Sequence, residues 1–546
     1  MKLLKHPFVL LFFIVCIAFF IRTLQLKDNI LFGYDQARDA QRIYNMVYKG
    51  DLKIVGPETD IQGIFNGPLL YYALAPVYYF SNFDPNAAAL LFVFINVGTI
   101  LLIYWASKIL FNKNSIALIA SLLWAFSYEQ GFFSRYISNA SPMSTTTTIF
   151  FIGLALFFLK KKQWGLPLSA AGIALAIHCN FYFIYLFLFY PLFFLFFKPK
   201  IQIKTVAFTL GVLGILLSPW IVTELRWKFI GTKSLLTYFL HQGTTAASTN
   251  PFSFLLSIAS RYYERISQGI FFSFIPSKVV GFFIATILLI YLIFKRRTPS
   301  IIFLVVWVLN TLPLFAFKSG VHGVEVINGS VFVPLTILIA VGIEECKRIK
   351  IFKMSPIPLL CVAGIVLYGL VCYTKNTFIP NSIHTGASST LKNEKLIIDY
   401  TYKASGEKPF SICSISEPLF INTIWSFLYS TYGKQKYGYV PFWSGQRQIL
   451  NESFLPYAQK KLSIKYIIEE PLIGIPDYAP LATYFMEDTQ NNLISKTKFG
   501  EIRVQKRVFV KENTGNYKNI YTQNQVDKYK SLLNVEPRFS CDISYE

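Results

Sequence analysis

The stretch GYDQARDAQRIYNMV, residues 33–47, follows the first apolar run of the chain and carries far more charge than the segments around it. Asp35 and Asp39 are four residues apart, so a helix places both carboxylates on one face. Arg38 lies three residues after Asp35, and Arg42 three after Asp39, so each acid has a guanidinium within reach. This pattern predicts a short amphipathic helix at the edge of a bilayer that presents carboxylates to a bound partner.

The opposite face of this predicted helix is apolar and suits contact with a membrane surface; its residues are Ala40, Ile43, Tyr44, Val47 and Tyr48. A simpler interpretation of Asp35 stays open. Asp is a preferred N-cap residue, and after Gly33 and Tyr34 it could serve to satisfy the free backbone donors of the helix start. Spacing alone does not decide between a functional carboxylate and a cap.

The composition is that of a polytopic membrane protein. Of the 546 residues, 53% are hydrophobic, 17% are aromatic and only 15% are charged, with 53 Phe and a mean hydropathy of +0.44. A soluble domain of this size does not have such a composition. The net charge of +23 comes from cations placed between apolar runs, without a basic stripe interleaved with aromatic residues, which excludes a nucleic-acid partner.

Apolar runs of spanning length divide the first 374 residues. The first, from Phe8 to about Leu26, follows Lys2 and Lys5 and has no small-residue cleavage site after it, so we interpret it as a transmembrane helix rather than a signal peptide. Residues 66–80 are too short to span and predict an interfacial or re-entrant segment. With the first, eleven spans are predicted, the others at about 87–107, 115–133, 141–159, 163–178, 181–197, 203–221, 276–294, 299–317, 329–344 and 355–373.

The positive-inside rule orients these spans. With the N-terminus inside, all basic clusters of the loops fall on the inner side, provided that residues 164–197 are split at His178. The outer face then holds the Asp35 helix, Arg135, His178, His322, the loop 222–275 and the C-terminus. We therefore expect an integral plasma (inner) membrane protein with a cytoplasmic N-terminus.

From about residue 375 the chain becomes polar and alternates strand-like runs, at 410–413, 466–468 and 501–504, with helix-like runs such as 419–432. The predicted fold class is thus mainly α: a transmembrane domain of about 11 helices at 1–374, with a first outer loop at 27–86, and an extracytoplasmic α/β domain at 375–546. Cys413 and Cys541 both fall in this second domain, where a disulfide is possible in an oxidising compartment. No phosphate-binding glycine loop is present, so a nucleotide sugar is not indicated.

The layout of short motifs resembles the GT-C membrane glycosyltransferases, among them the protein O-mannosyltransferases and the bacterial transferase that moves aminoarabinose onto lipid A. The resemblance covers roughly residues 1–373 and rests on the order and spacing of Tyr34–Ala40, Gly56-Pro57, Asn66–Tyr72, Ser134–Asn139, the His178 turn and Pro219–Arg226. It implies a polyprenyl-phosphate sugar donor, reaction at the outer face and inversion of the anomeric centre. Gln36 stands where the family often has Glu, and Asn66 where many relatives have His.

Carried onto this chain, the resemblance implies a role for each candidate residue. Asp35 would be the catalytic base, with Asp39 as a helper, although an ion pair of Asp39 with Arg42 is an equal alternative. The donor phosphate would be bound by Arg135, Arg38, Arg226 and His178. The substrate-binding site would be lined by Gln36, Asn66, Tyr71 and Glu224.

Structural alternatives stay open for these residues: an interface anchor for Arg135 and Tyr71, a local salt pair for Arg226 with Glu224, and a hydrated turn for His178. No metal site is certain, but Asp35, Glu58 and Asp60 are possible ligands of a divalent metal.

The predicted function is transfer of a sugar from a polyprenyl-phosphate carrier to a glycolipid or protein acceptor of the cell envelope. The alternatives are a polysaccharide polymerase or ligase and a lipid-linked sugar flippase or transporter. A transporter would place ionisable residues at mid-span, whereas the charges here gather at the ends of the apolar runs.

Overall fold

The computed structural model describes residues 6–241, 251–269, 273–274, 277–295, 297–316, 324–346, 356–375, 390–406, 408–448, 453–472, 475–509, 521–535 and 541. His322 and residues 376–389, which follow the predicted domain boundary at 375, lie outside the described residues.

The chain divides into two compact units, each built from separate stretches of sequence. Unit 1 consists of residues 1–24, 51–74 and 89–378, and unit 2 of residues 25–50, 75–88 and 379–546. Two parts of the predicted first outer loop, 27–50 and 75–86, are therefore grouped with the C-terminal residues. Helix α2 (Tyr34–Lys49), which carries the acidic pair, belongs to unit 2.

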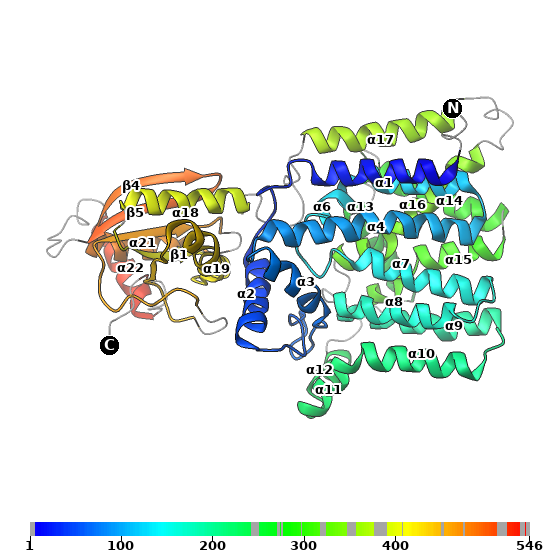
Figure 1. Ribbon diagram of the computed structural model, residues 1–546, viewed down its shortest axis with the longest axis horizontal. Helices are drawn as coiled ribbons and strands as arrows, with labels where there is room; N and C mark the ends of the chain where they lie inside the picture. The colour runs from blue at the N-terminus through cyan, green and yellow to red at the C-terminus, as the bar shows by residue number, and fades with distance from the viewer. Residues whose placement is uncertain are drawn as a thin grey trace. The chain divides into compact units, whose positions relative to one another are not determined.

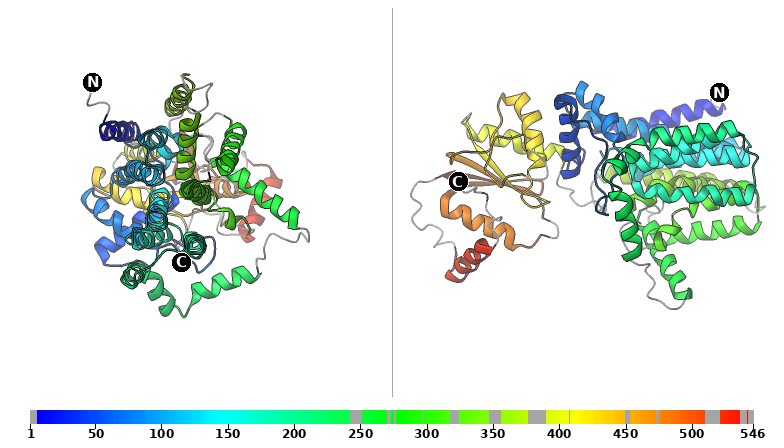
Figure 2. Two further views of the ribbon diagram at one scale, coloured as in Figure 1. Left: turned by 90° about the vertical axis from the view of Figure 1, so that its right-hand side faces the viewer. Right: turned by 90° about the horizontal axis from the view of Figure 1, so that it is seen from below.

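Most helices of unit 1 are apolar, run side by side in Figure 1 and are seen nearly end-on in the left view of Figure 2, whereas α11 and α12 turn away from them. Two helices cross the boundary between the units in sequence, namely α3 (Leu69–Phe80) and α4 (Pro85–Phe111). The other helices of unit 1 are α1 (Pro7–Thr23), α5 (Asn114–Phe126), α6 (Tyr128–Phe133), α7 (Met143–Leu154), η2 (Ala155–Leu159), α8 (Gly165–Cys179), η3 (Phe181–Leu188), α9 (Phe189–Phe197), α10 (Ile203–Leu216), α11 (Ser218–Arg226), α12 (Ile230–His241), α13 (Pro251–Gly269), α14 (Lys278–Lys295), α15 (Pro299–Val308), η5 (Leu312–Ala316), α16 (Val324–Cys346) and α17 (Ile357–Lys375).

Each predicted span coincides with one or two of these helices. By length and composition, two described helical segments could cross a bilayer, α4 and residues Gly329–Cys346 of α16, and the pair α10 and α11, bent by 58°, could make a third. Shorter apolar helices of 10–17 residues account for the other predicted spans. The number of about eleven spans stays a prediction, whereas the mainly helical class and the apolar character of the helices are confirmed.

The break predicted at His178 is present in the structure. Helix α8 ends at Cys179, and the next helix, η3, begins at Phe181. Asn180 lies between them in an extended conformation, and its side chain accepts a hydrogen bond from the backbone N–H of Tyr182 at 3.0 Å. Asn180 thus ends α8 with its backbone N–H, which donates to the carbonyl of Ala176, and starts η3 with its side chain.

Unit 2 contains a five-stranded sheet in the order β2-β1-β3-β5-β4. Strands β1 and β2 and strands β1 and β3 are parallel, whereas β5 runs antiparallel to both β3 and β4. The predicted strand-like runs near residues 410, 466 and 501 correspond to β1, β3 and β5. The elements from the C-terminal part are α18 (Leu391–Ser405), β1 (Ser411–Ile415), α19 (Thr423–Leu428), η8 (Tyr429–Gly433), α20 (Lys434–Tyr437), β2 (Phe442–Trp443), β3 (Ile464–Glu469), α21 (Tyr478–Gln490), β4 (Asn491–Phe499), β5 (Ile502–Phe509) and α22 (Gln523–Val535).

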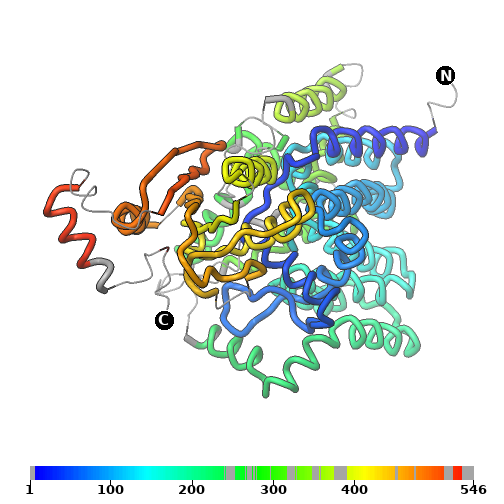
Figure 3. Tube along the Cα trace, turned by 60° about the vertical axis from the view of Figure 1, so that its left-hand side comes forward, coloured from blue at the N-terminus to red at the C-terminus, as the bar shows by residue number. Residues whose placement is uncertain are grey.

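Helices cover both faces of this sheet. Alternate residues of β3 point to opposite faces. Tyr466 packs against Tyr400 of α18 on one face, and Lys465 forms a buried ion pair with Glu487 of α21, at 2.6 Å, on the other. Figure 3 follows the trace of these C-terminal elements from α18, in yellow, to α22, in red.

A disulfide joins Cys413 of β1 to Cys541 across 128 residues of sequence, as the sequence allowed. Both cysteines are fully buried.

Candidate functional site

Asp35 is not the N-cap residue of the acidic helix α2. Gly33 is the N-cap residue, and the side chain of Gln36 accepts a hydrogen bond from its N–H at 3.0 Å. Gly50 ends the helix in the left-handed conformation, with a φ of 68°. The alternative in which Asp35 is the N-cap is therefore wrong, and Gln36 has a structural function in this helix start.

The two carboxylates share one guanidinium. Arg38 donates from Nη1 to Asp35 at 2.6 Å and from Nε to Asp39 at 2.9 Å. The side chain of Asp35 is 63% exposed, whereas that of Asp39 is 13% exposed. Asp35 thus presents a carboxylate to solvent, and Arg38 holds it beside a second, mostly buried acid.

Only part of the predicted apolar face of α2 packs inside unit 2: Ala40 and Ile43 are buried, Tyr44 and Val47 are half-buried, and Tyr48 is 53% exposed. Ala37, Ala40 and Ile43 are fully buried, and α2 packs against α19. Gln41 is also buried, and its side-chain amide donates to the carbonyl of Thr423, at the start of α19, at 3.3 Å.

In unit 1, the predicted Asn66-Gly67 motif and His178 come together. The N–H of Gly67 donates to the carbonyl of His178 at 3.2 Å, and the side chain of Asn66 accepts from the N–H of Phe181 at 3.0 Å. Trp220 of α11 completes this junction, because its ring lies 4.7 Å from that of His178 and its indole N–H donates to the carbonyl of Phe65 at 3.1 Å. Three motifs far apart in the sequence thus meet.

His178 is 5% exposed and is held firmly in this junction. Its Nε2 is 2.8 Å from the carbonyl oxygen of Leu216, at the end of α10. Among the described residues, its Nδ1 has no hydrogen-bond partner. His178 is therefore a packed histidine with one ring nitrogen uncommitted, not a hydrated turn residue.

Arg135 is engaged with the end of the first helix. Its guanidinium donates to the backbone carbonyls of Arg22 at 2.9 Å, of Ile21 at 3.3 Å and of Leu24. The carbonyls of Ile21 and Arg22 belong to the last turn of α1 and that of Leu24 to its C-cap residue, so they have no partner within the helix. Arg135 is 3% exposed, so it is neither an exposed anchor nor an open phosphate ligand in this structure.

Arg22 is a buried cation that the sequence reasoning missed. It is fully buried and donates to the side chain of Asn96 at 2.9 Å and to the carbonyls of Trp124 and Ala125 at the end of α5, at 3.0 and 2.7 Å. An Arg inside the first apolar run was the available signal, since charges in such runs are costly and have specific partners.

The other predicted residues of unit 1 have diverse surroundings. Glu224 accepts from the N–H and hydroxyl of Thr232 at 3.1 and 2.8 Å, and among the described residues it forms no ion pair with Arg226, which is exposed. Tyr71 is buried.

Glu58 and Asp60 are exposed, and Glu58 accepts from the N–H of Gly63 at 2.6 Å. Within the described ranges, no three His, Cys, Asp or Glu side chains are arranged to hold a metal ion.

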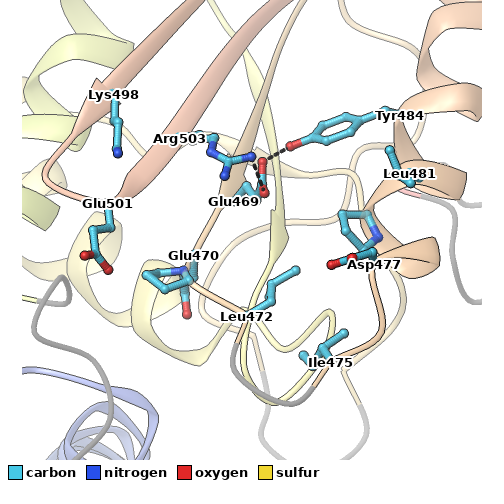
Figure 4. A pocket seen from close by; sticks show the side chains of 12 residues that line it. Glu469, Glu470, Leu472, Ile475, Asp477, Leu481, Tyr484, Lys498, Glu501 and Arg503 are labelled. Carbon is cyan, nitrogen blue, oxygen red and sulfur yellow. Dashed lines mark hydrogen bonds and ion pairs between the residues drawn. The ribbon is translucent and has the colours of Figure 1, made fainter.

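A cavity of about 520 Å³ lies in unit 2 at the carboxyl end of β3, apart from the predicted site residues (Figure 4). The Glu469 carboxylate faces this cavity. It accepts hydrogen bonds from the guanidinium of Arg503, at 3.1 Å, and from the hydroxyl of Tyr484. Glu470 lies in its wall and accepts from the indole N–H of Trp425 at 2.8 Å.

Among known structures, the chain is similar along most of its length to ArnT from Cupriavidus metallidurans bound to undecaprenyl phosphate. The TM-score is 0.53 at 11% identity, and the match covers 90% of this chain and 97% of ArnT. The chain has the fold of a GT-C glycosyltransferase. The GT-C resemblance inferred from the motifs is thus confirmed at the level of the fold.

Two other GT-C enzymes match with lower scores. The oligosaccharyltransferase of Archaeoglobus fulgidus has a TM-score of 0.43 at 12% identity over 81% of this chain, which spans 65% of that protein. The mycobacterial arabinofuranosyltransferase AftD has 0.39 at 11% identity, over 74% of this chain and 29% of AftD. No family model matches the chain, and no curated protein matches it in sequence.

Proposed function

We propose that this protein is a membrane glycosyltransferase that moves a sugar from a polyprenyl-phosphate carrier to an acceptor hydroxyl at the outer face of the membrane. Support comes from the GT-C fold, since the similar ArnT structure contains undecaprenyl phosphate, and from the apolar helices of unit 1. The observation that carries the proposal is the exposed carboxylate of Asp35 at the start of α2, supported by Arg38 and Asp39.

In the proposed reaction, Asp35 accepts the proton of the acceptor hydroxyl as the acceptor oxygen attacks the anomeric carbon. The bond between that carbon and the phosphate oxygen breaks, and polyprenyl phosphate leaves with the electron pair. Attack from the side opposite the phosphate inverts the anomeric centre. Arg38, bonded to both acids, keeps Asp35 in position and balances its charge.

The leaving phosphate needs a cation or a hydrogen-bond donor. Arg226 at the end of α11 is exposed, and His178, which packs against Trp220 of the same helix, has one ring nitrogen without a described partner. Of Arg226, His178 and Arg135, only Arg226 is exposed, since His178 is 5% and Arg135 3% exposed. We therefore assign phosphate binding to Arg226 before His178 and before Arg135, whose guanidinium is engaged with the end of α1.

The disulfide supports an outer location of α2. Disulfides form in oxidising compartments, and Cys413 and Cys541 belong to the same unit as α2. The acids of α2 would then face the compartment in which lipid-linked sugars are consumed by enzymes of this fold.

The proposal is tested with the purified protein in lipid nanodiscs, radiolabelled polyprenyl-phosphate hexose and a membrane extract as the source of acceptor. Asp35→Asn should lower sugar transfer by about 10²–10⁴-fold, the usual contribution of a general base. Asp51→Asn is the matched control, because Asp51 is another partly exposed acid, ion-paired with Lys53 at 2.5 Å. Equal transfer by wild type and Asp35→Asn would refute the assignment.

A further inference from the structure

The segment that leads into α2 is bonded to the start of α18. The N–H of Leu391 donates to the carbonyl of Ile30 at 3.1 Å, and the N–H of Lys392 donates to that of Asp28 at 2.9 Å. These donors lie in the first turn of α18, where backbone N–H groups have no partner within the helix. The acidic helix is thus tied by main-chain bonds to an element more than 340 residues later in the chain.

The side chain of Asp28 strengthens this attachment. It forms an ion pair with Lys395 of α18 at 2.5 Å, and the exposed fractions of the two side chains are 22% and 16%. Asn86 donates to the same carboxylate at 3.0 Å, and Lys395 lies over the ring of Tyr432 at 5.2 Å. Although burial acts to raise the pKa of Asp28, the hydrogen bonds from Lys395 and Asn86 hold it below its usual value.

Aromatic contacts attach α2 on both sides of its acidic turn. Phe32, just before the helix, is fully buried with its ring 5.6 Å from that of Phe427 in α19. Tyr44, in the third turn, lies 5.0 Å from Phe454. The Asp35 carboxylate projects from a helix that is anchored before its first turn and along its buried face.

We propose that Lys395 is a positioning residue for sugar transfer: through Asp28 it holds the start of α2, and with it Asp35, against the C-terminal elements of unit 2. This inference rests on the proposed function, because it assigns Asp35 to the reaction. Asp28 is seven residues before Asp35, so an anchor there restrains the first helical turn, in which Asp35 lies. Displacement of a reacting group by about 1 Å can cost 10²-fold in rate.

The experiment compares three variants in the full-length protein in nanodiscs. Lys395→Met removes the charge and keeps the apolar stem, and Lys395→Arg keeps the charge. Lys436→Met is the matched control, because Lys436 forms a similar ion pair with Asp399 in the same unit, at 2.8 Å. Each variant is measured by kcat and donor KM in the transfer assay, and by hydrogen exchange of the backbone amides in α2 and α21.

We expect Lys395→Met to lower kcat by about tenfold or more, within the range for a misplaced group, with donor KM unchanged. Exchange in α2 should rise while exchange in α21 stays as in wild type. Lys395→Arg should retain the kcat and the α2 exchange of wild type, and Lys436→Met should change neither quantity. A loss of kcat with equal loosening of α2 and α21 would mean general destabilisation and would overturn the proposal, as would unchanged exchange in α2 or unchanged kcat.

The exchange measurement separates this inference from the proposed function. If wild type transfers sugar and Asp35→Asn transfers it equally well, the role of Asp35 fails, whatever the exchange shows. If Asp35→Asn is inactive but Lys395→Met is fully active, the positioning role alone fails.

Discussion

Gly67 lies against the ring of His178 so closely that a Cβ on Gly67 would be 2.0 Å from Nδ1 of the histidine. The His178 ring is held in place, because its Nε2 is hydrogen-bonded to the carbonyl of Leu216 and the ring packs against Trp220. The N–H of Gly67 donates to the carbonyl of His178 in the same contact. Two segments that are more than a hundred residues apart therefore meet at a distance that only glycine permits.

Replacement of this glycine should destabilise unit 1. Gly67→Ala places a methyl group in occupied space, and we expect a loss of about 1–3 kcal/mol, as for other overpacked sites. Gly98→Ala, in α4, is the control, since a Cβ there has no atom within 4 Å. The midpoint of thermal unfolding in detergent, followed by tryptophan fluorescence, measures both. A Gly67→Ala protein as stable as Gly98→Ala would contradict the contact.

Arg135 should behave as a stabilising residue rather than as a ligand of donor phosphate. Arg135→Met removes the donors for the carbonyls of Ile21 and Arg22, and loss of such bonds to a charged group costs about 1.5–3 kcal/mol each. We expect a lower unfolding temperature, with an unchanged donor KM for the fraction that remains folded. An unchanged unfolding temperature together with a raised donor KM would instead support phosphate binding.

Reduction of the Cys413–Cys541 disulfide should weaken unit 2. A disulfide that closes a long loop typically contributes about 2–4 kcal/mol, and this one spans 128 residues. Dithiothreitol and the Cys413→Ser, Cys541→Ser double variant should therefore lower the unfolding temperature equally, and dithiothreitol should not lower that of the double variant further. Mass spectrometry of non-reduced peptides from membranes checks the pairing. Free thiols at both positions would contradict it.

The stability of unit 2 should fall as the pH rises from about 4.5 through neutrality. Burial raises the pKa of Glu470 from 4.5 to about 7, and burial together with the charge of Glu470 raises the pKa of Glu394. The folded state then retains protons that the unfolded chain releases, so stability declines with increasing pH, by about 3 kcal/mol for Glu470. Asp28, whose pKa is lowered, acts in the opposite direction, and its contribution is lost only below about pH 4.

Unfolding by urea at pH 5 and pH 8 measures this effect. Glu470→Gln should reduce the difference between the free energies of unfolding at pH 5 and pH 8. Glu501→Gln, which changes an exposed carboxyl at the same cavity, should leave this difference as in wild type. Stability that is constant, or that increases, between pH 5 and pH 8 would show that the two buried carboxyls do not titrate in this way.

Hydropathy and turn chemistry predicted much of the fold, because they act locally. The apolar runs of unit 1 became helices near the expected residues, and the polar His178-Cys179-Asn180 break separates α8 from η3. The strand-like runs around Cys413 and Ile467 became parallel partners. Each of these features depends on neighbours in sequence or on a simple period.

The contacts of the candidate site depend on partners that no local pattern names. An apolar stripe on α2 suits lipid and protein equally, so packing against α19 was not predictable from the stripe. Likewise, the carbonyls that Arg135 binds are 111 to 114 residues earlier and belong to a helix end, which has no side-chain signature. The ion pair of Asp35 with Arg38, by contrast, was predictable from their spacing, because it lies within one helix turn.

The assembly of unit 2 from three separate stretches has a consequence for biosynthesis. Helix α2 is made early, but the α19 residues that cover its apolar face are about 380 residues later. At roughly 5–20 residues per second, the ribosome takes on the order of 20 to 80 s to reach them. During that interval α19, against which the buried face of α2 packs, has not yet been made.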